Sequence, residues 1–159
     1  MKRLLIANRG EIAVRIIRTA QEMGIETVLA ASEADTDSVA ADLADSVTVI
    51  GPAKATTSYL NRDALIEAIR RTGADGVHPG YGFLSEDAEF ARAVEELGAS
   101  WVGPSSTSIA LMGNKAAARQ AAQDAGVPIL AGSREIVKSC GSRVVRRPRT
   151  LGCRAMVPG

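Results

Sequence analysis

The chain has 159 residues, of which 46% are hydrophobic and 23% are charged. This is enough for one domain with a sizeable core and is ordinary for a soluble globular protein, so composition alone indicates no function. The apolar run that precedes Asn8 is too short for a signal peptide, and no window approaches the length of a membrane span. We therefore expect a cytoplasmic protein that has no membrane partner.

Charge is spread unevenly along the chain. Residues 1–135 hold thirteen basic residues and all eighteen acidic ones, whereas the rest holds six basic residues and no acidic one. An acidic body argues against a nucleic-acid surface on the folded part. Both cysteines, Cys140 and Cys153, lie in the basic end, and His78 is the only histidine of the sequence. We expect neither a zinc site, which needs four ligands, nor a disulfide in the cytosol.

Short β-type runs alternate with longer helical runs from Arg3 to Ala125, which is typical of a parallel sheet covered by helices. We predict strands at 4–7, 27–31, 46–50, 76–78 and 100–102. We predict helices at 11–23, 62–72, 86–97, 105–111 and 115–125. A glycine follows four of these helices, where a left-handed residue closes the last turn with little strain: Gly24, Gly73, Gly98 and Gly126.

The first predicted helix has an apolar and a charged side. The apolar stripe, which should face the core, consists of Ile12, Ile16, Ile17, Ala20 and Met23. The opposite side carries Glu11, Arg15, Arg18 and Glu22. From the residues alone, this charged stripe is interpreted as a solvated face with intrahelical ion pairs.

The segment from Ala7 to Ala13 leads from a short apolar strand directly into a helix, which is how an α/β domain of the nucleotide-binding type begins. It holds a single glycine where dinucleotide-binding domains carry Gly-x-Gly-x-x-Gly, and Glu11 would repel a phosphate at the helix start. An NAD or FAD enzyme is therefore disfavoured. We expect Asn8 and Arg9 to bind backbone or a neighbouring loop rather than to act in catalysis.

A glycine-rich turn, residues 79–82, follows the predicted strand that ends at His78. It lies at the carboxyl end of a strand, where open parallel sheets bind ligands. We expect Ser85 to cap the next helix. From the residues alone, Tyr81 fits packing over its own loop as well as it fits a ligand contact, and His78 is interpreted as a structural residue.

Lys115 opens a predicted helix after Met112-Gly113-Asn114. Its ammonium group and the free backbone N–H groups of the helix start are suited to an anion. The simpler interpretation is a solvated lysine. Asn114 is a residue type that caps helices.

Three of these motifs occur in one order and spacing: 7–13, 78–86 and 103–115. Together they resemble the N-terminal part of biotin carboxylase, the ATP-using module of biotin-dependent carboxylases. The resemblance covers about residues 2–139. It implies a three-layer α/β, Rossmann-like pre-ATP-grasp domain with a mostly parallel sheet over residues 1–113, and the start of an ATP-grasp domain over residues 114–139.

The resemblance implies a ligase that uses ATP, Mg²⁺ and bicarbonate to carboxylate biotin on a biotin carboxyl carrier protein. Bicarbonate is activated as carboxyphosphate with release of ADP, and the carboxyl group then passes to the biotin ureido nitrogen. By resemblance, Lys115 contacts ATP, and Tyr81 and Gly82 border the biotin pocket. Arg18 and Glu22 match positions in a homodimer interface. Asn114 departs from the family pattern, because many relatives carry aspartate there.

The Mg²⁺-holding carboxylates, the phosphate-covering loop and the residues of the carboxylation step lie later in the family's sequence. Residues 140–159 instead hold five arginines and no acid. We interpret them as a disordered, non-family tail produced by a shifted reading frame. We therefore expect a truncated fragment that has no catalytic or metal site, binds no cofactor tightly and is inactive alone. The alternatives are a non-catalytic α/β interaction or dimerisation module and a basic-tailed nucleic-acid binder.

Overall fold

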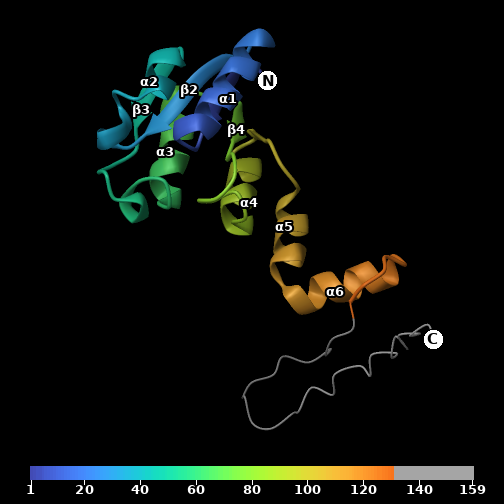
Figure 1. Cartoon of the computed structure of the whole chain (residues 1–159). Coiled ribbons are helices and arrows are strands. Elements are labelled where there is room, and N and C mark those ends of the chain that lie inside the picture. Colours follow the sequence, from blue (N-terminus) through green and yellow to red (C-terminus); the bar gives the residue numbers. More distant parts are fainter. Residues whose placement is uncertain (131–159) are drawn as a thin grey trace, which may run out of the picture.

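The computed structural model describes residues 1–130, and their centre is a five-stranded parallel sheet (Figure 1). The predictions for the tail at 140–159, and for the last part of the segment 114–139, lie outside the described residues. Within residues 1–130 no helix has the length and apolar character needed to cross a membrane.

The strands pair in the order β3-β2-β1-β4-β5. Their bounds are Arg3–Ile6 for β1, Glu26–Ala31 for β2, Ser46–Val49 for β3, Gly76–His78 for β4 and Ser100–Trp101 for β5. The order changes direction at β1, which pairs with β2 on one side and with β4 on the other. The loops that follow β1 and β4 therefore leave the same edge of the sheet next to each other.

Six α-helices and two short 3₁₀ helices complete the described residues. The helices are α1 (Gly10–Glu22), α2 (Val39–Leu43), α3 (Arg62–Thr72), α4 (Ala88–Glu96), α5 (Ser106–Gly113) and α6 (Lys115–Asp124); the 3₁₀ helices are η1 (Glu33–Asp35) and η2 (Ala55–Thr57). The sequence predicted all of the α-helices except α2. That helix has only five residues, which is too short to show a helical period.

Successive residues of the strands pack into two cores on opposite faces of the sheet. Leu5, Val28 and Val77 belong to the core that also contains residues of α3 and α4. Leu4 and Leu29 belong to the core that contains residues of α1 and α2. Because both faces carry helices, the predicted three-layer α/β architecture with a parallel sheet is confirmed.

Helix ends confirm one local prediction and correct two. The four glycines predicted to follow helices all have φ between 64° and 78°. Met23 was placed in the apolar stripe of α1, but it is the C-cap residue and its side chain is 69% exposed. Ser85 was expected to cap α4, but the cap is Asp87, whose Oδ1 accepts from the Phe90 N–H at 2.9 Å. Ser85 instead closes a turn, because its backbone N–H donates to the Gly82 carbonyl.

The buried position of Leu5 in β1 yields a stability prediction. We expect Leu5→Ala to lower the free energy of unfolding by about 2–5 kcal/mol, because a fully buried side chain leaves a cavity. Leu60→Ala removes the same atoms from a side chain that is 40% exposed, and should cost about 1 kcal/mol or less. Urea unfolding followed by the fluorescence of Trp101 measures both losses. Equal losses would contradict the burial of Leu5.

Candidate functional site

The loops after β1 and β4 are joined by the side chain of Asn8. This side chain is 1% exposed. Its Nδ2 donates to the carbonyl oxygens of Pro79 at 2.7 Å and Tyr81 at 2.9 Å, while its Oδ1 accepts from the Arg9 N–H at 2.9 Å. The expectation that Asn8 binds a neighbouring loop is therefore confirmed.

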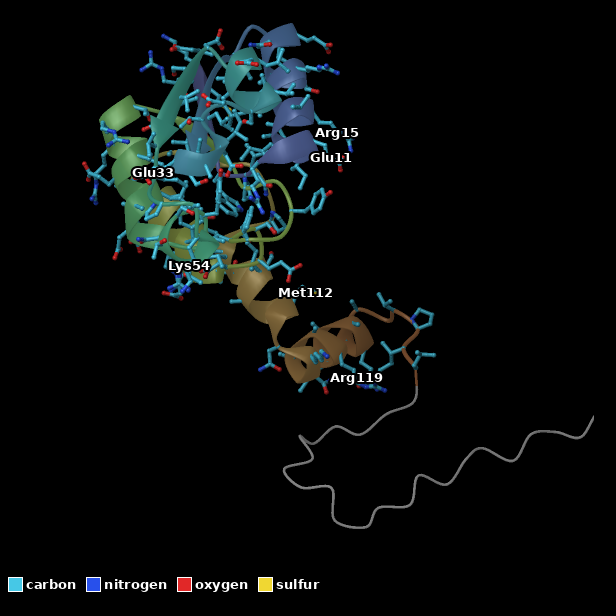
Figure 2. The ribbon with its side chains drawn as sticks, turned by 60° about the vertical axis from the view of Figure 1, so that its left-hand side comes forward. Glu11, Arg15, Glu33, Lys54, Met112 and Arg119 are labelled. Carbon is cyan, nitrogen blue, oxygen red and sulfur yellow. The ribbon has the colours of Figure 1, made fainter. Side chains whose placement is uncertain are left out.

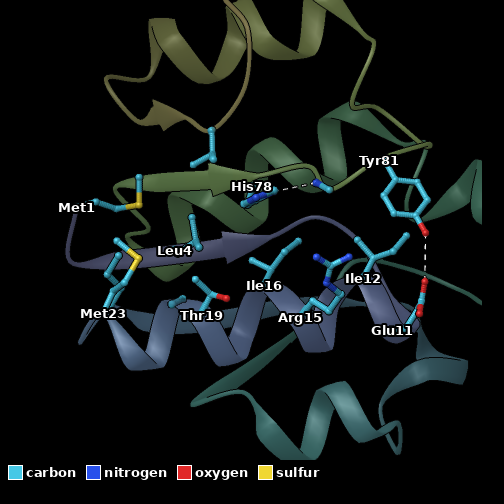
Figure 3. A pocket seen from close by; sticks show the side chains of 14 residues that line it. Met1, Leu4, Glu11, Ile12, Arg15, Ile16, Thr19, Met23, His78 and Tyr81 are labelled. Atoms are coloured by element: carbon cyan, nitrogen blue, oxygen red, sulfur yellow. Dashed lines mark hydrogen bonds between the residues drawn. The ribbon is translucent and has the colours of Figure 1, made fainter.

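The loop from Pro79 to Phe83 projects from the carboxyl end of β4. Gly80 and Gly82 have φ of 65° and 69°, a conformation that glycine adopts at little cost. Tyr81, between them, is 62% exposed, and its hydroxyl donates to Glu11 Oε1 across a distance of 3.3 Å (Figure 3). The loop thus places one aromatic ring and one bare stretch of backbone at the surface.

The far end of this loop is held by stacked rings. Phe83 has φ of 42°, a left-handed conformation that costs a residue with a side chain about 1–3 kcal/mol. Its ring stacks on Tyr59 with centroids 5.0 Å apart. The Arg9 guanidinium lies over both rings, with Cζ 5.7 Å and 5.8 Å from the two centroids. These contacts offset the strain and fix where the loop returns to the body.

Arg9 and Tyr59 converge on one carboxylate. Asp35 Oδ2 accepts from the Ser32 hydroxyl at 2.6 Å and from the Tyr59 hydroxyl at 2.7 Å, and lies 3.8 Å from Arg9 Nη1. Burial raises the pKa of Asp35, but the hydrogen bonds from Ser32 and Tyr59 and the charge of Arg9 outweigh it, so the pKa lies below its ordinary value. Burial and the nearby carboxylate raise the pKa of Tyr59. The sequence did not predict this cluster around Asp35, because Arg9 and Tyr59 are far from Asp35 in the sequence and form no local motif with it.

His78 ends β4 and holds the start of the loop. Its Nδ1 accepts from the Gly80 N–H at 3.0 Å, so the neutral ring carries its proton on Nε2 (Figure 3). Burial lowers the pKa of the half-buried imidazole. This contact supports the interpretation of His78 as a structural residue.

A groove with a volume of about 650 Å³ runs along α1 beside this loop. In Figure 3 it extends from Met1 and Met23 at one end to Tyr81 and Glu11 at the other. Apolar side chains such as Ile16 form much of its lining. Tyr81 therefore stands at the boundary between the groove and the carboxyl edge of the sheet.

The other predicted site residues lie apart from the loop. Arg18 and Glu22 are both exposed on α1. Lys115 is exposed at the start of α6, which lies beyond α5 and away from the sheet (Figures 1 and 2). Lys115 is therefore not brought next to Tyr81.

The first turn of α6 is capped by Asn114, a residue type that commonly caps helices. Asn114 Oδ1 accepts from the N–H groups of Ala116 and Ala117, each at 3.1 Å. The Asn114 side chain thus occupies two of the backbone N–H groups that were expected from the sequence to be free to bind an anion. Within residues 1–130 no group of three or more His, Cys, Asp or Glu residues is placed to hold a metal ion.

His78 yields a prediction for stability against pH. Above its ordinary pKa of 6.5 the ring is neutral in the folded and the unfolded chain, so its contribution to stability is complete there. As the pH falls through 6.5 the unfolded chain takes up the proton first, and stability is lost until the pH has passed the lower pKa of the folded state. We expect the melting temperature to fall between pH 7.5 and 5.5, and to fall less in His78→Asn.

Three aspartates whose pKa values are lowered do not obscure this range of pH. The pKa values of Asp35, Asp45 and Asp75 all lie below the ordinary 3.8, so these groups titrate below the range tested. An identical drop in melting temperature in the wild type and in His78→Asn would show that His78 is not responsible.

The comparison with known sequences gives one consistent family. The model of the biotin carboxylase N-terminal domain matches residues 1–109. Biotin carboxylase 1 of Bacillus subtilis is 50% identical over 139 residues, which are 87% of this chain and 31% of that protein. The biotin carboxylase of Halalkalibacterium halodurans is 54% identical over 132 residues, which are 83% of this chain and 29% of that protein.

Solved structures agree with the sequence match. The biotin carboxylase domain of a thermophilic 2-oxoglutarate carboxylase bound to bicarbonate has a TM-score of 0.81 and 41% identity, over 87% of this chain and 31% of that one. The dimer of such a domain from Hydrogenobacter thermophilus, in complex with MgADP, ADP and bicarbonate, has a TM-score of 0.82 and 42% identity, over 87% and 30% of the two chains. The chain spans about three tenths of the length of these relatives. It belongs to the family of biotin carboxylase N-terminal domains.

Proposed function

We propose that the chain supplies the N-terminal, biotin-contacting part of a biotin carboxylase, the ligase that uses ATP and bicarbonate to carboxylate biotin on a biotin carboxyl carrier protein. The observation that carries the proposal is the Tyr81–Gly82 turn at the carboxyl end of β4, in a chain of this family. Tyr81 is 62% exposed. A Cβ added at Gly82 would meet no atom within 4 Å, so a ligand has room there.

Biotin has chemistry that fits this turn. Its ureido group offers a carbonyl acceptor, and its fused rings offer an apolar face. Within residues 1–130 the Gly82 N–H donates to no backbone carbonyl, and we assign it to the ureido carbonyl. The ring of Tyr81 then covers the apolar face of the ligand.

The nucleotide part of the proposal rests on Lys115. We assign residues 1–113 to the N-terminal domain and the segment from 114 to the start of an ATP-grasp domain. Lys115 would hold a phosphate oxygen of ATP, and no carboxylate within residues 1–130 forms an ion pair with its ammonium group. Mg²⁺ and bicarbonate would be bound by the longer enzyme. Arg18 and Glu22 would lie in the homodimer interface, because both are exposed on one helix.

Biotin titration tests the first assignment. We expect biotin to shift the backbone amide signals of Tyr81 and Gly82 in NMR spectra, with a Kd of about 1 mM, because few groups contact it. Tyr81→Ala should weaken binding about fivefold, since an aromatic contact contributes about 1 kcal/mol. Met23→Ala, a change to a side chain that is 69% exposed at the other end of the groove, should leave binding unchanged. Equal weakening by both variants would contradict the assignment.

ATP titration tests the second assignment, the contact between Lys115 and a phosphate oxygen of ATP. Lys115→Gln should weaken ATP binding about fivefold or more, because one charge-assisted hydrogen bond to phosphate is lost. Lys54→Gln removes the same charge from another exposed lysine and should have little effect. Calorimetry, or the NMR chemical shifts of residues in α6, can measure the ATP affinities of both variants. If the two variants weaken binding equally, only net charge matters and Lys115 has no specific role.

A further inference from the structure

We infer that Asn8 is the positioning residue for the ligand-binding turn at Tyr81 and Gly82. The inference rests on the proposed function, in which this turn contacts biotin. Asn8 is 1% exposed and so cannot touch a ligand itself. It acts through the two carbonyl groups that its side chain holds.

The orientation of the Asn8 amide is unambiguous. An asparagine side chain offers two N–H donors on Nδ2 and an acceptor on Oδ1. Both partners of Nδ2 are carbonyl oxygens, those of Pro79 and Tyr81, and the partner of Oδ1 is the Arg9 N–H. A flipped amide would set an oxygen against two oxygens and an NH₂ group against an N–H. The buried side chain therefore has one arrangement, and that arrangement fixes two points of the loop.

One of these points determines which way the Gly82 N–H faces. The chain has no cis peptide among its described residues, so the C=O and N–H of the Tyr81–Gly82 peptide point in opposite directions. Asn8 draws the Tyr81 carbonyl toward the interior at 2.9 Å. The Gly82 N–H is consequently turned outward, as a donor for a ligand. A flip of this peptide would present a carbonyl instead and remove the donor.

The loop lies directly against Asn8. A Cβ at Gly80 would be 2.7 Å from Asn8 Nδ2 and 2.8 Å from Ile12 Cγ2. Any larger residue at Gly80 would therefore push the loop away from the amide that holds it. The next segment is held separately, because the Ser85 N–H donates to the Gly82 carbonyl at 2.9 Å. The Tyr81–Gly82 peptide thus lies between two independent attachments.

Asn8 is not needed to pair the strands. The parallel ladder between β1 and β4 already includes Ile6 and His78, and the Ala7 N–H donates to the His78 carbonyl at 3.0 Å. The Asn8 side chain adds contacts only beyond the end of this ladder. If Asn8 only stabilises the fold, its loss should lower the melting temperature and leave the Tyr81–Gly82 turn unchanged. If Asn8 positions the turn, its loss should change the direction of the Gly82 N–H.

Four forms of the 159-residue chain distinguish these roles: the wild type, Asn8→Leu, Gly80→Ala and Gly98→Ala. Asn8→Leu keeps the approximate size of the side chain but removes both donors. Gly80→Ala displaces the loop without changing Asn8. Gly98→Ala is the matched control, since Gly98 also has positive φ, of 78°, but a Cβ there would meet no atom within 4 Å. Each form is measured for biotin affinity, melting temperature and the residual dipolar coupling of the Gly82 N–H bond, which reports its direction.

We expect Asn8→Leu and Gly80→Ala to weaken biotin binding at least tenfold and to change the Gly82 coupling. Gly98→Ala should lower the melting temperature, but its biotin affinity and its Gly82 residual dipolar coupling should match those of the wild type. A folded Asn8→Leu with biotin binding within twofold of wild type and an unchanged coupling would overturn the inference. If Asn8→Leu does not fold, the same two measurements on Gly80→Ala decide: biotin binding within twofold of wild type and an unchanged Gly82 coupling would overturn the inference. If the wild type binds no biotin, the proposed function fails, and the coupling alone still decides whether Asn8 positions the turn.

Discussion

The buried amide of Asn8 is the contact on which the carboxyl edge of the sheet depends. The loop after β1 leads into α1 on one face of the sheet, while the loop after β4 leads to α4 on the other. Loops that separate in this way leave a crevice, which is where open parallel sheets bind ligands. Asn8 joins the two loops, because its Nδ2 donates to the carbonyls of Pro79 and Tyr81, and Tyr81 itself is exposed.

A second set of contacts keeps the same loop rigid at its other end. The lowered pKa of Asp35 keeps its carboxylate ionised, and the raised pKa of Tyr59 keeps its phenol protonated. The phenol therefore donates to the carboxylate over the whole neutral range of pH, which fixes the ring on which Phe83 stacks. Strain at Phe83 is tolerated because charge, hydrogen bonds and stacking all favour one position of this ring.

The sequence predicted the fold well because its signals were local. The apolar run in β1 is typical of a strand buried on both faces, and glycines marked the ends of the helices. The cluster of Ser32, Asp35 and Tyr59 was missed, since Ser32 and Tyr59 are 27 positions apart. The loop after β4 was found from its glycines, and Asn8 was expected to bind backbone or a neighbouring loop, but the sequence did not identify the carbonyls of Pro79 and Tyr81 as its partners. Lys115, Arg18 and Glu22 stay predictions, because their roles require a nucleotide or a second chain.

The two proposed ligand sites differ in how firmly this chain holds them. The Tyr81–Gly82 turn is attached to the strand ends through Asn8 and His78, and the Ser85 N–H closes the turn onto the Gly82 carbonyl. Lys115 lies at the start of α6, which contacts α5, and α5 in turn contacts α4. One of the contacts between α5 and α4 is a hydrogen bond of 2.8 Å from the Ser106 hydroxyl to Glu95 Oε2. Phosphoryl transfer requires reacting groups held in line within a fraction of an ångström. In the proposed enzyme the biotin turn is therefore preorganised by this domain, whereas the position of the nucleotide relative to biotin must be set by contacts from the longer protein.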